Sequence, residues 1–319
     1  MARRRDVHEN LPIEGVSLLG RGRVTDTAWG FEEGDEIAPG LFATTLLGGG
    51  SKHEAYLAWD DRLFALVVVK ILRPHVANDA SARRQIAGEA GALAALQHPV
   101  LPRCFGATAD GERPRVVLEF LEGPRLSTLI RKQGALAMEQ ALPLAIRLCS
   151  ALHYMAHEGW VHLDVKPKNV VMGAPPQLID LSIAVPVDRA GDLSGPIGTD
   201  AYMAPEQCGV PDAGRITPAT DIWGLGVTVY EGIAGRLPYP RGQAETSGPD
   251  RFPQLVHDPE PLPKDVPGSL ADPIMWCLAR RPEERPTAAA LAERLEPLVA
   301  VLPKPAIVPR IRPRRRSHR

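Results

Sequence analysis

The chain has 319 residues, of which 44% are hydrophobic and 24% are charged, and these are ordinary values for a soluble globular protein. Its formal net charge of -1 argues against nucleic-acid binding over the whole body of the chain. No apolar run reaches the roughly 18 residues of a transmembrane helix, and the start shows no signal-peptide pattern.

The first 121 residues are predicted to form an extension followed by a strand-rich lobe. Residues 1–33 show no sustained periodicity, so we expect a flexible extension. In residues 34–121, apolar and β-branched runs alternate with Gly or Asp turns, as in "LFATTLLGGG", "EAYLAWD", "FALVVVKILR" and "PRVVLEFLEG". This alternation indicates a meander of strands.

One helix is predicted inside the strand-rich lobe, within "NDASARRQIAGEAGALAALQHP". Asn78 is the expected N-cap, Ala and Leu fill the interior, and Pro99 marks the end. Glu89, Leu93 and Leu96 fall at three- and four-residue spacings, so we expect them on one face.

Residues 122–300 are predicted to form a larger, mainly helical lobe. The segment "MEQALPLAIRLCSALHYMAHEG" is amphipathic and ends at Gly159, "ATDIWGLGVTVYEGIAG" is apolar enough for a buried helix, and "PTAAALAERLEPL" begins with Pro. Residues 236–270 contain too much Pro and Gly for long regular elements. Residues 301–319 are expected to form a basic, disordered tail. The predicted fold class is therefore α+β with two lobes, and a cleft between lobes is a usual place for a ligand.

Polar residues embedded in apolar runs match the needs of phosphoryl transfer, which are neutralised phosphates, a held metal ion and an oriented acceptor hydroxyl. In "HLDVKPKN", Asp164 can accept the proton of the acceptor, Lys166 can steady the phosphate, and Asn169 offers an oxygen to Mg²⁺. Asp180 in "LIDLS" is a second metal ligand, and Lys70 at the end of "ALVVVK" could bind phosphates.

The chain contains, in order, "LLGGGSKHEAYLA", "VVVK", "HLDVKPKN", "DLS", "GTDAYMAPE", "DIWGLG" and "RPEERPT". These motifs resemble those of Hanks-type protein kinases, particularly the bacterial serine/threonine branch. In the same order, they correspond to the glycine-rich loop, the strand lysine, the catalytic loop, the metal-binding triplet, the substrate-positioning loop, the supporting helix and the final arginine motif. The resemblance runs from about Gly34 to Leu298. It implies that Arg285 pairs with Glu206.

The resemblance implies a kinase fold with a small β-rich lobe containing one key helix and a larger helical lobe. The implied activity is transfer of the γ-phosphoryl group of ATP to Ser or Thr hydroxyls of protein substrates, with Mg²⁺, or alternatively Mn²⁺. The implied catalytic residues are Asp164, Lys166 and Thr199, and the implied metal ligands are Asn169 and Asp180. The implied ATP-binding residues are Leu47, Gly48, Gly50, Ala55, Val68, Lys70, Glu89, Glu119, Leu121 and Val171.

Within that set the resemblance assigns separate tasks. Glu89 would hold Lys70 against the α- and β-phosphates, and the backbone at Glu119 and Leu121 would bind the adenine edge. Three other residues are implied to be structural: Asp221 accepts backbone hydrogen bonds from the catalytic loop, while His162 and Trp223 pack internally.

Three departures from the family pattern bear on activity. His53 stands where a third glycine is usual, which should stiffen the glycine-rich loop. Leu163 replaces the Arg that commonly precedes the catalytic Asp and that receives an activation-loop phosphate. Ser182 in "DLS" removes a flexible glycine, while Leu181 can still pack apolar surface.

A fourth departure is compensated. The family usually has Val in the second strand and Ala two residues before the strand lysine, and both touch adenine. This chain has Ala55 and Val68 instead. The exchange keeps the summed side-chain volume of the two residues above the purine unchanged. This favours a pocket that still binds an adenine base.

Two rival functions remain open at this point. A pseudokinase, which would bind a nucleotide or a partner with little transfer, is favoured by the altered loop and triplet and opposed by the complete Lys-Glu-Asp-Asn-Asp set. A small-molecule kinase of the aminoglycoside type is opposed by "GTDAYMAPE" and "DIWGLG". The sequence names neither the substrate nor the activating signal. The basic termini "MARRRD" and "RIRPRRRSHR" are expected to be solvated tails or to contact an anionic surface or acidic partner.

Location and regulation are also predicted. The four cysteines are dispersed without a CxxC pair, which favours reduced thiols and a cytoplasmic location. In the segment 180–206 the one hydroxyl free to act as a switch is Ser194, and Arg189 is a poor receptor for its phosphate. Because Leu163 occupies the usual receptor position, we expect activity that does not depend on phosphorylation of this segment, with control by substrate recruitment or by the termini.

Overall fold

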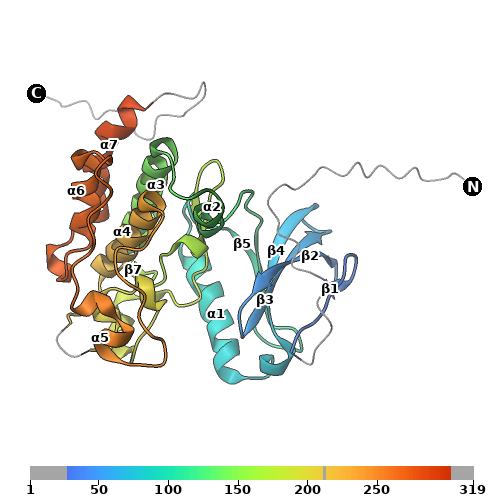
Figure 1. Cartoon of the computed structure of the whole chain (residues 1–319). Helices are drawn as coiled ribbons and strands as arrows, with labels where there is room; N and C mark the ends of the chain where they lie inside the picture. The colour runs from blue at the N-terminus through green and yellow to red at the C-terminus, as the bar shows by residue number, and fades with distance from the viewer. Residues whose placement is uncertain (1–26, 211–212, 303–319) are drawn as a thin grey trace, which may run out of the picture.

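The computed structural model describes residues 27–210 and 213–302, which form two lobes (Figure 1). The N-lobe is a six-stranded antiparallel sheet in the order β1-β2-β3-β4-β6-β5 with one long helix, α1 (Ala80–Ala95). Its strands are β1 (Glu36–Ala38), β2 (Leu41–Gly49), β3 (His53–Asp60), β4 (Ala65–Leu72), β5 (Cys104–Thr108) and β6 (Arg115–Glu119). Alternation along the strands buries one face, where Tyr56, Val67, Val69 and Ile71 share a core.

The cap of α1 corrects one expectation. The side chain of Asp79 accepts a hydrogen bond from the Ala82 amide at 2.7 Å, so Asp79 is the N-cap and not Asn78. The helix ends at Ala95, before Pro99, as expected. Its inner face is buried at Glu89, Leu93 and Leu96, and this places an acidic side chain inside the N-lobe.

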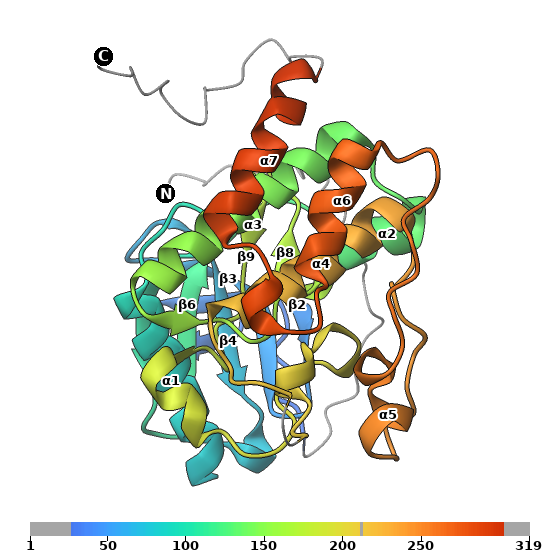
Figure 2. The ribbon, with the colours of Figure 1, turned by 90° about the vertical axis from the view of Figure 1, so that its left-hand side faces the viewer.

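The C-lobe is mainly helical, and Figure 2 shows α7 crossing in front of α3 beside α6. Its helices are α2 (Leu126–Gln133), α3 (Met138–His157), α4 (Pro218–Ala234), α5 (Gly248–Arg251), α6 (Gly268–Cys277) and α7 (Ala288–Val301). Helix α3 packs against both α4 and α7, and this layer forms the large core. Two short strand pairs frame the catalytic loop: β7 (Trp160–Val161) with β10 (Val185–Pro186), and β8 (Val170–Val171) with β9 (Gln177–Leu178).

The two-lobed α+β architecture and the three long C-lobe helices are confirmed. Residues 236–270 contain the four-residue helix α5 and the first three residues of α6, so the expected lack of long elements is confirmed up to Pro267. Helices α2 and α6 were not anticipated. Among the described helices, none is both long and apolar enough to span a bilayer.

The predicted ends lie mostly outside the described residues. Residues 1–26 of the extension and residues 303–319 of the basic tail are in this group. The described end of the extension packs against the N-lobe sheet: Trp29 stacks on Phe31, and the Phe31 ring meets the edge of Tyr56 with centroids 5.4 Å apart. The domain boundaries themselves stay predictions.

Candidate active site

The catalytic loop between β7 and β8 is held by its backbone. Asp221, in the first turn of α4 and only 4% exposed, accepts hydrogen bonds from the amides of His162 at 2.7 Å and Leu163 at 2.8 Å. Gln207 Nε2 donates to the Leu163 carbonyl at 2.8 Å. Leu163 has a φ of 66°, which is uncommon for a residue with a side chain, and these bonds on both sides hold it there.

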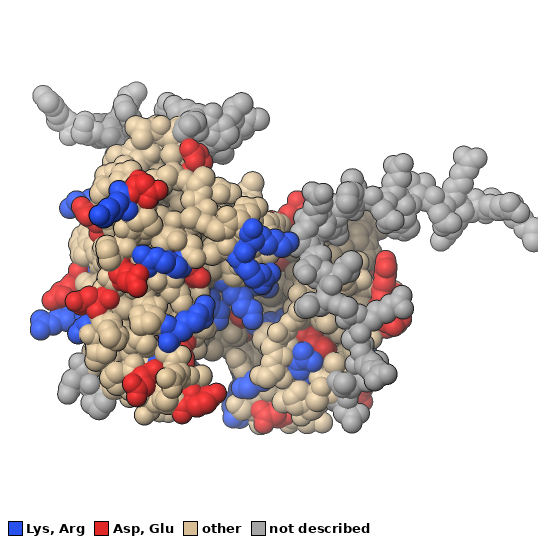
Figure 3. Space-filling model, viewed as in Figure 1, with Lys and Arg blue, Asp and Glu red and all other residues tan. Residues whose placement is uncertain are grey.

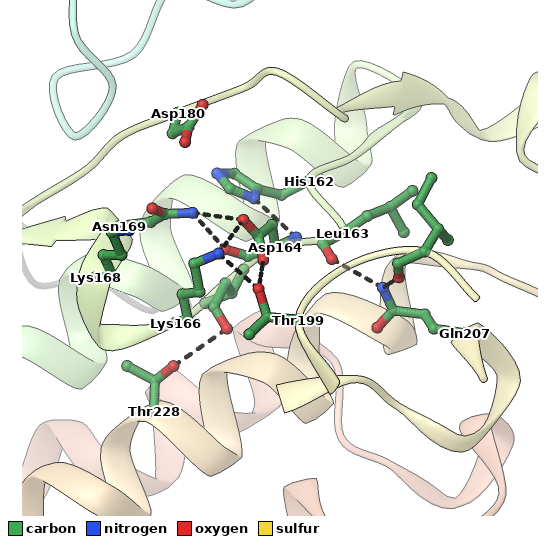
Figure 4. A network of polar contacts seen from close by, with 12 residues as sticks. His162, Leu163, Asp164, Lys166, Lys168, Asn169, Asp180, Thr199, Gln207 and Thr228 are labelled. Atoms are coloured by element: carbon green, nitrogen blue, oxygen red, sulfur yellow. Dashed lines mark hydrogen bonds and ion pairs between the residues drawn. The ribbon is translucent and has the colours of Figure 1, made fainter. Parts of the chain in front are cut away.

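Asp164 is the centre of a polar network (Figure 4). Its Oδ2 accepts hydrogen bonds from Lys166 Nζ at 2.6 Å and Asn169 Nδ2 at 2.9 Å, and its Oδ1 accepts from Thr199 Oγ1 at 2.8 Å. Lys166 Nζ also donates to Thr199 Oγ1 at 2.6 Å. The network therefore brings the three predicted catalytic residues together and fixes the carboxylate, whose side chain keeps 11% of its surface exposed.

Asn169 and Asp180, the predicted metal ligands, lie on neighbouring segments. Asn169 Nδ2 also donates to the Asp164 carbonyl at 3.0 Å, and Figure 4 shows the side-chain oxygen of Asn169 directed away from Asp164. The Ile179 amide donates to the Asn169 carbonyl at 2.8 Å, which ties the Asp180 segment to the catalytic loop. The amide oxygen and the carboxylate are hard donors suited to Mg²⁺.

An ion-paired triad joins the two lobes. Lys70 on β4 lies 2.8 Å from a carboxylate oxygen of Glu89 on α1 and 2.7 Å from Asp180 Oδ1 in the C-lobe. The side chains of Lys70 and Glu89 are buried, whereas that of Asp180 is 28% exposed. The structure thus places Glu89 where it holds Lys70 in position. Figure 3 shows the surface hollowed where the lobes meet, with Lys and Arg side chains beside the opening.

Lys70 and Asp180 stabilise each other's charge, whereas burial raises the pKa of Glu89 above its ordinary value although Lys70 lies beside it. Burial lowers the pKa of Lys70, but Glu89 and Asp180 more than offset this effect, so its pKa is raised above the ordinary value. Burial raises the pKa of Asp180, but the Lys70 ammonium reverses the effect, so its pKa lies below the ordinary value. Both groups are therefore charged at neutral pH, as phosphate and metal binding require.

The glycine turn, which we define as residues 48–53, connects β2 to β3. Gly48 has a φ of 137°, a conformation that favours glycine. Gly50 donates its amide to the His53 carbonyl at 3.0 Å. A Cβ at Gly49 would collide with the same carbonyl oxygen. Gly49 is thus required by the turn although sequence reasoning named only its neighbours; the unbroken run of three glycines was the available signal.

His53 occupies the position of the usual third glycine. Its ring packs against Gly50, with Cε1 3.6 Å from the place a Cβ on Gly50 would take. Burial, with the nearby Lys70 charge, lowers the pKa of His53 to about 4. The imidazole is therefore neutral near pH 7 and fills space beneath the turn without adding a charge.

The predicted adenine contacts lie on one face of the sheet. Ala55 is opposite Lys70 in the β3-β4 register, and Val68 is opposite both Leu57 and Leu118. Side chains two residues apart on one strand point the same way, so Val68 and Lys70 share a face, and Ala55 is a diagonal neighbour of Val68. Both exchanged residues are half-buried.

The remaining residues predicted to contact the nucleotide lie on other strands and on the segment between the lobes. Leu47 and Gly48 lie near the end of β2, and Val171 lies on β8, 7% exposed. Glu119 ends β6, where its amide donates to the Arg103 carbonyl at 2.9 Å and its carboxylate pairs with Arg103 at 3.0 Å. Leu121 follows in the segment that connects the lobes. The nucleotide roles of these residues stay predictions.

An apolar cluster packs against the activation segment, which we define as residues 180–206. It stands where the family usually has an Arg that binds a phosphate on this segment. Leu163, 3% exposed, is buried together with Val161 and Ala190. Partly buried hydrophobic residues pack around them, and these are Ile183, Val185, Val187, Leu193, Ile197 and Ile216. Most of the cluster comes from the segment between Asp180 and Glu206, so the segment is held to the catalytic loop by burial.

The end of the activation segment is fixed by a buried ion pair. Arg285 Nη1 and Nη2 lie 2.6 and 2.8 Å from the two carboxylate oxygens of Glu206, and both side chains are fully buried. Thr220 donates its hydroxyl to Glu206 at 2.7 Å. This is the pairing that the resemblance implied, in the bidentate geometry that guanidinium and carboxylate favour.

Sequence reasoning missed a second anchor of the same segment. Arg251 of α5 lies 2.7 and 3.1 Å from the carboxylate oxygens of Asp200, and Gln254 Nε2 donates to the carbonyls of Asp200 at 2.9 Å and Met203 at 3.1 Å. The two sides of these contacts are about 50 residues apart, and Arg251 and Gln254 lie in an irregular, Pro-rich stretch, so no periodic signal marks them.

The site and fold agree with the comparison to known proteins. A family model for the protein kinase domain matches residues 43–295. The chain therefore belongs to the protein kinase family.

The chain is similar over most of its length to curated bacterial protein kinases. The chain is 30% identical over 258 residues to serine/threonine-protein kinase PknB of Mycobacterium tuberculosis, a match that covers 77% of this chain and 40% of the relative. It is 32% identical over 241 residues to PkaA of Streptomyces coelicolor, covering 72% and 42%. It is 30% identical over 249 residues to PknA of M. tuberculosis, covering 75% and 56%. The chain thus spans about half the length of these relatives.

Proposed function

We propose that this protein is an ATP-dependent protein kinase that phosphorylates Ser or Thr hydroxyls. The observation that supports it most is that Lys70, Glu89 and Asp180 form one ion-paired triad across the lobes. Asp180 of this triad lies close to the network of Asp164 in Figure 4. The serine/threonine-protein kinases among the relatives support the choice of acceptor.

The geometry gives each residue a task. Asp164 would accept a hydrogen bond from the acceptor hydroxyl, orient it in line and take its proton as the oxygen bonds to phosphorus. Lys166 would neutralise the transferring phosphate, since its ammonium already lies at the Asp164 carboxylate. Thr199 holds the second carboxylate oxygen and so limits the rotation of Asp164.

The donor set fits a divalent metal held together with nucleotide phosphates. In the described part of the chain no three His, Cys, Asp or Glu side chains gather into a metal site of their own. Mg²⁺ commonly takes one or two protein ligands and completes its shell with phosphate oxygens and water. Asn169 and Asp180 would hold it, and the metal would neutralise charge on the phosphates. We propose Mg²⁺, with Mn²⁺ as the alternative.

A transfer assay tests the function. Purified protein, radiolabelled ATP and peptide libraries with Ser, Thr or Tyr as the sole acceptor should give label on Ser or Thr with Mg²⁺ or Mn²⁺ and none with EDTA. ATP binding without transfer would instead favour the pseudokinase reading. Transfer only to a small metabolite would favour the small-molecule kinase.

The exchanged adenine contacts make a prediction on nucleotide affinity. Ala55→Val should raise the Kd for ATP by at least about fivefold, because overpacking a filled site costs about 1 kcal/mol or more. Adding Val68→Ala should restore part of the affinity, since the two residues are diagonal neighbours. Calorimetric titration of both single variants and the double variant measures this. If the changes in the free energy of ATP binding caused by the two single substitutions simply added up in the double variant, a shared contact of the two residues with the base would be contradicted.

The apolar cluster around Leu163 makes a prediction on regulation. Because burial holds the activation segment, activity should not require a phosphate there. Ser194 is exposed, and the protein after phosphatase treatment and the Ser194→Ala variant should both keep most of their kcat. The check is a transfer assay before and after treatment, with intact mass to count phosphates. A loss of about tenfold or more in either case would show that another basic residue receives the phosphate.

Location and partners complete the proposal. We propose a cytoplasmic protein, because ATP is its substrate and its four cysteines are unpaired. Its partners would be proteins that present Ser or Thr, and the basic termini would contact an acidic partner or anionic surface.

A further inference from the structure

The glycine turn is hydrogen-bonded to one residue through both its backbone and its side chain. Arg73 follows the last residue of β4, and its amide donates to the Lys52 carbonyl at 2.9 Å. Its guanidinium Nε donates to the Gly50 carbonyl at 2.8 Å. One residue, three positions after Lys70, thus binds two carbonyls of the turn that lies over the expected phosphate site.

Arg73 is itself fixed by a buried carboxylate. Its Nη1 lies 3.1 Å from Oε1 of Glu54, which is 2% exposed although it sits on β3 next to the turn. The Tyr56 hydroxyl donates to Oε2 of Glu54 at 3.3 Å. Burial and the nearby Glu54 charge raise the pKa of Tyr56 to about 12, so its hydroxyl keeps the proton that it donates. The buried carboxylate is thereby paired and hydrogen-bonded, as burial of a charge requires.

Residues 27–31, which we call the N-terminal strap, complete this anchor. The Trp29 amide donates to Oε2 of Glu54 at 3.1 Å, and the Trp29 indole donates to the Leu72 carbonyl at 2.7 Å. Arg73 Nη1 donates to the Thr27 carbonyl at 3.0 Å. The strap thus closes over Arg73 and limits the positions open to its guanidinium. It lies outside the residues matched by the kinase family model.

We propose that Arg73 is a positioning residue for ATP, which holds the glycine turn in place over the phosphates, and that Glu54 and the N-terminal strap fix its guanidinium. The inference rests on the proposed function, since it assumes that the turn meets nucleotide phosphates. Arg73 touches the turn from outside and acts on ATP only through Gly50 and Lys52. Its effect should therefore fall on phosphate binding and spare the nucleoside.

The test compares ATP with adenosine on Arg73→Met. The Kd for ATP should rise by about tenfold, because the charge-assisted bond that restrains the turn is lost. The Kd for adenosine should change by less than about twofold, because the adenine face on β3 and β4 is intact. In transfer assays the KM for ATP should rise more than kcat falls. Arg73→Lys keeps the charge and should recover part of the affinity.

Two controls separate positioning from general stability. Arg83→Met removes a cation of α1 that binds the carbonyls of Ala77 and Gly111 and the side chain of Asn78, and none of these contacts involves the turn, Glu54 or the strap. It should leave the Kd for ATP unchanged.

A second variant covers the risk that Arg73→Met leaves Glu54 without a cation and unfolds the protein. Adding Glu54→Gln removes that unpaired charge, and the double variant should show the same selective loss of ATP affinity.

Each outcome decides between the two proposals. An unchanged Kd for ATP in the Arg73 variants, or an equal loss for ATP and adenosine, overturns the positioning role. A wild-type protein that binds no ATP at all overturns the proposed function instead. A loss confined to ATP, with partial rescue by Arg73→Lys, supports the role.

Discussion

Asp164→Asn should lower kcat for phosphoryl transfer by roughly 10²- to 10⁴-fold while leaving the Kd for ATP nearly unchanged. The amide has the shape of the carboxylate but cannot take a proton from the acceptor hydroxyl. Its NH₂ group could donate to the Thr199 hydroxyl in one orientation, whereas in the other it would face the two donors Lys166 and Asn169. Steady-state transfer kinetics and calorimetric ATP titration on the same preparation measure the two quantities.

The matched control for this variant is Asp110→Asn, which makes the same chemical change at an exposed position between β5 and β6. It should keep wild-type kcat. If Asp164→Asn were as active as this control, Asp164 could not be the residue that accepts the proton, and the acceptor would have to be oriented by another group.

Lys70→Met should reduce transfer by at least about 10²-fold, because a preorganised cation at the phosphates is lost. The change leaves Glu89 buried without its partner and leaves Asp180 without the cation that lowers its pKa. The ATP Kd should rise as well. Transfer assays measure the first effect, and adenosine binding together with thermal unfolding shows whether the N-lobe stays folded.

Lys132→Met is the control for that variant, because Lys132 is an exposed lysine in the last turn of α2. It should leave both kcat and the Kd for ATP unchanged. A Lys70→Met protein that binds adenosine and retains wild-type transfer would remove Lys70 from phosphate binding.

The catalytic core was predictable because chemistry demands particular residue types at particular spacings. Asp164, Lys166 and Asn169 lie within one short loop, so the sequence alone brings them near each other. Glu89 was placed on the inner face of a helix by periodicity, and the structure pairs it with Lys70. For these residues the local pattern and the observed geometry agree.

The contacts that could not be predicted join segments that are distant in sequence and irregular in conformation. Trp29 meets Glu54, and Arg251 meets Asp200, across chain separations that no period encodes. The cap of α1 was misplaced by one residue because Asn78 and Asp79 are equally good caps side by side. Which of the two caps the helix depends on the backbone conformation, which the sequence pattern does not reveal.

Helix α6 was missed for a different reason. It contains Pro273 and follows a Pro-rich stretch, both of which argue against a helix. Its buried face, which includes Leu270, Ile274 and Cys277, joins the large core, and this tertiary packing overrides the local preference.

The bonds on either side of Leu163 bear on how such a protein can change over time. Asp221 binds the amide of Leu163 and Gln207 binds its carbonyl, so neither bond uses the side chain. The conformation of the catalytic loop is therefore separate from the choice of residue at this position. An Arg at this position would keep both backbone bonds but would bury its guanidinium beside Val161 and Ala190, so a phosphate receptor also requires polar changes in the surrounding apolar cluster. Dependence on phosphorylation of the activation segment is therefore a trait that a lineage gains through several coupled substitutions in this cluster, while the backbone of the catalytic loop can be inherited unchanged.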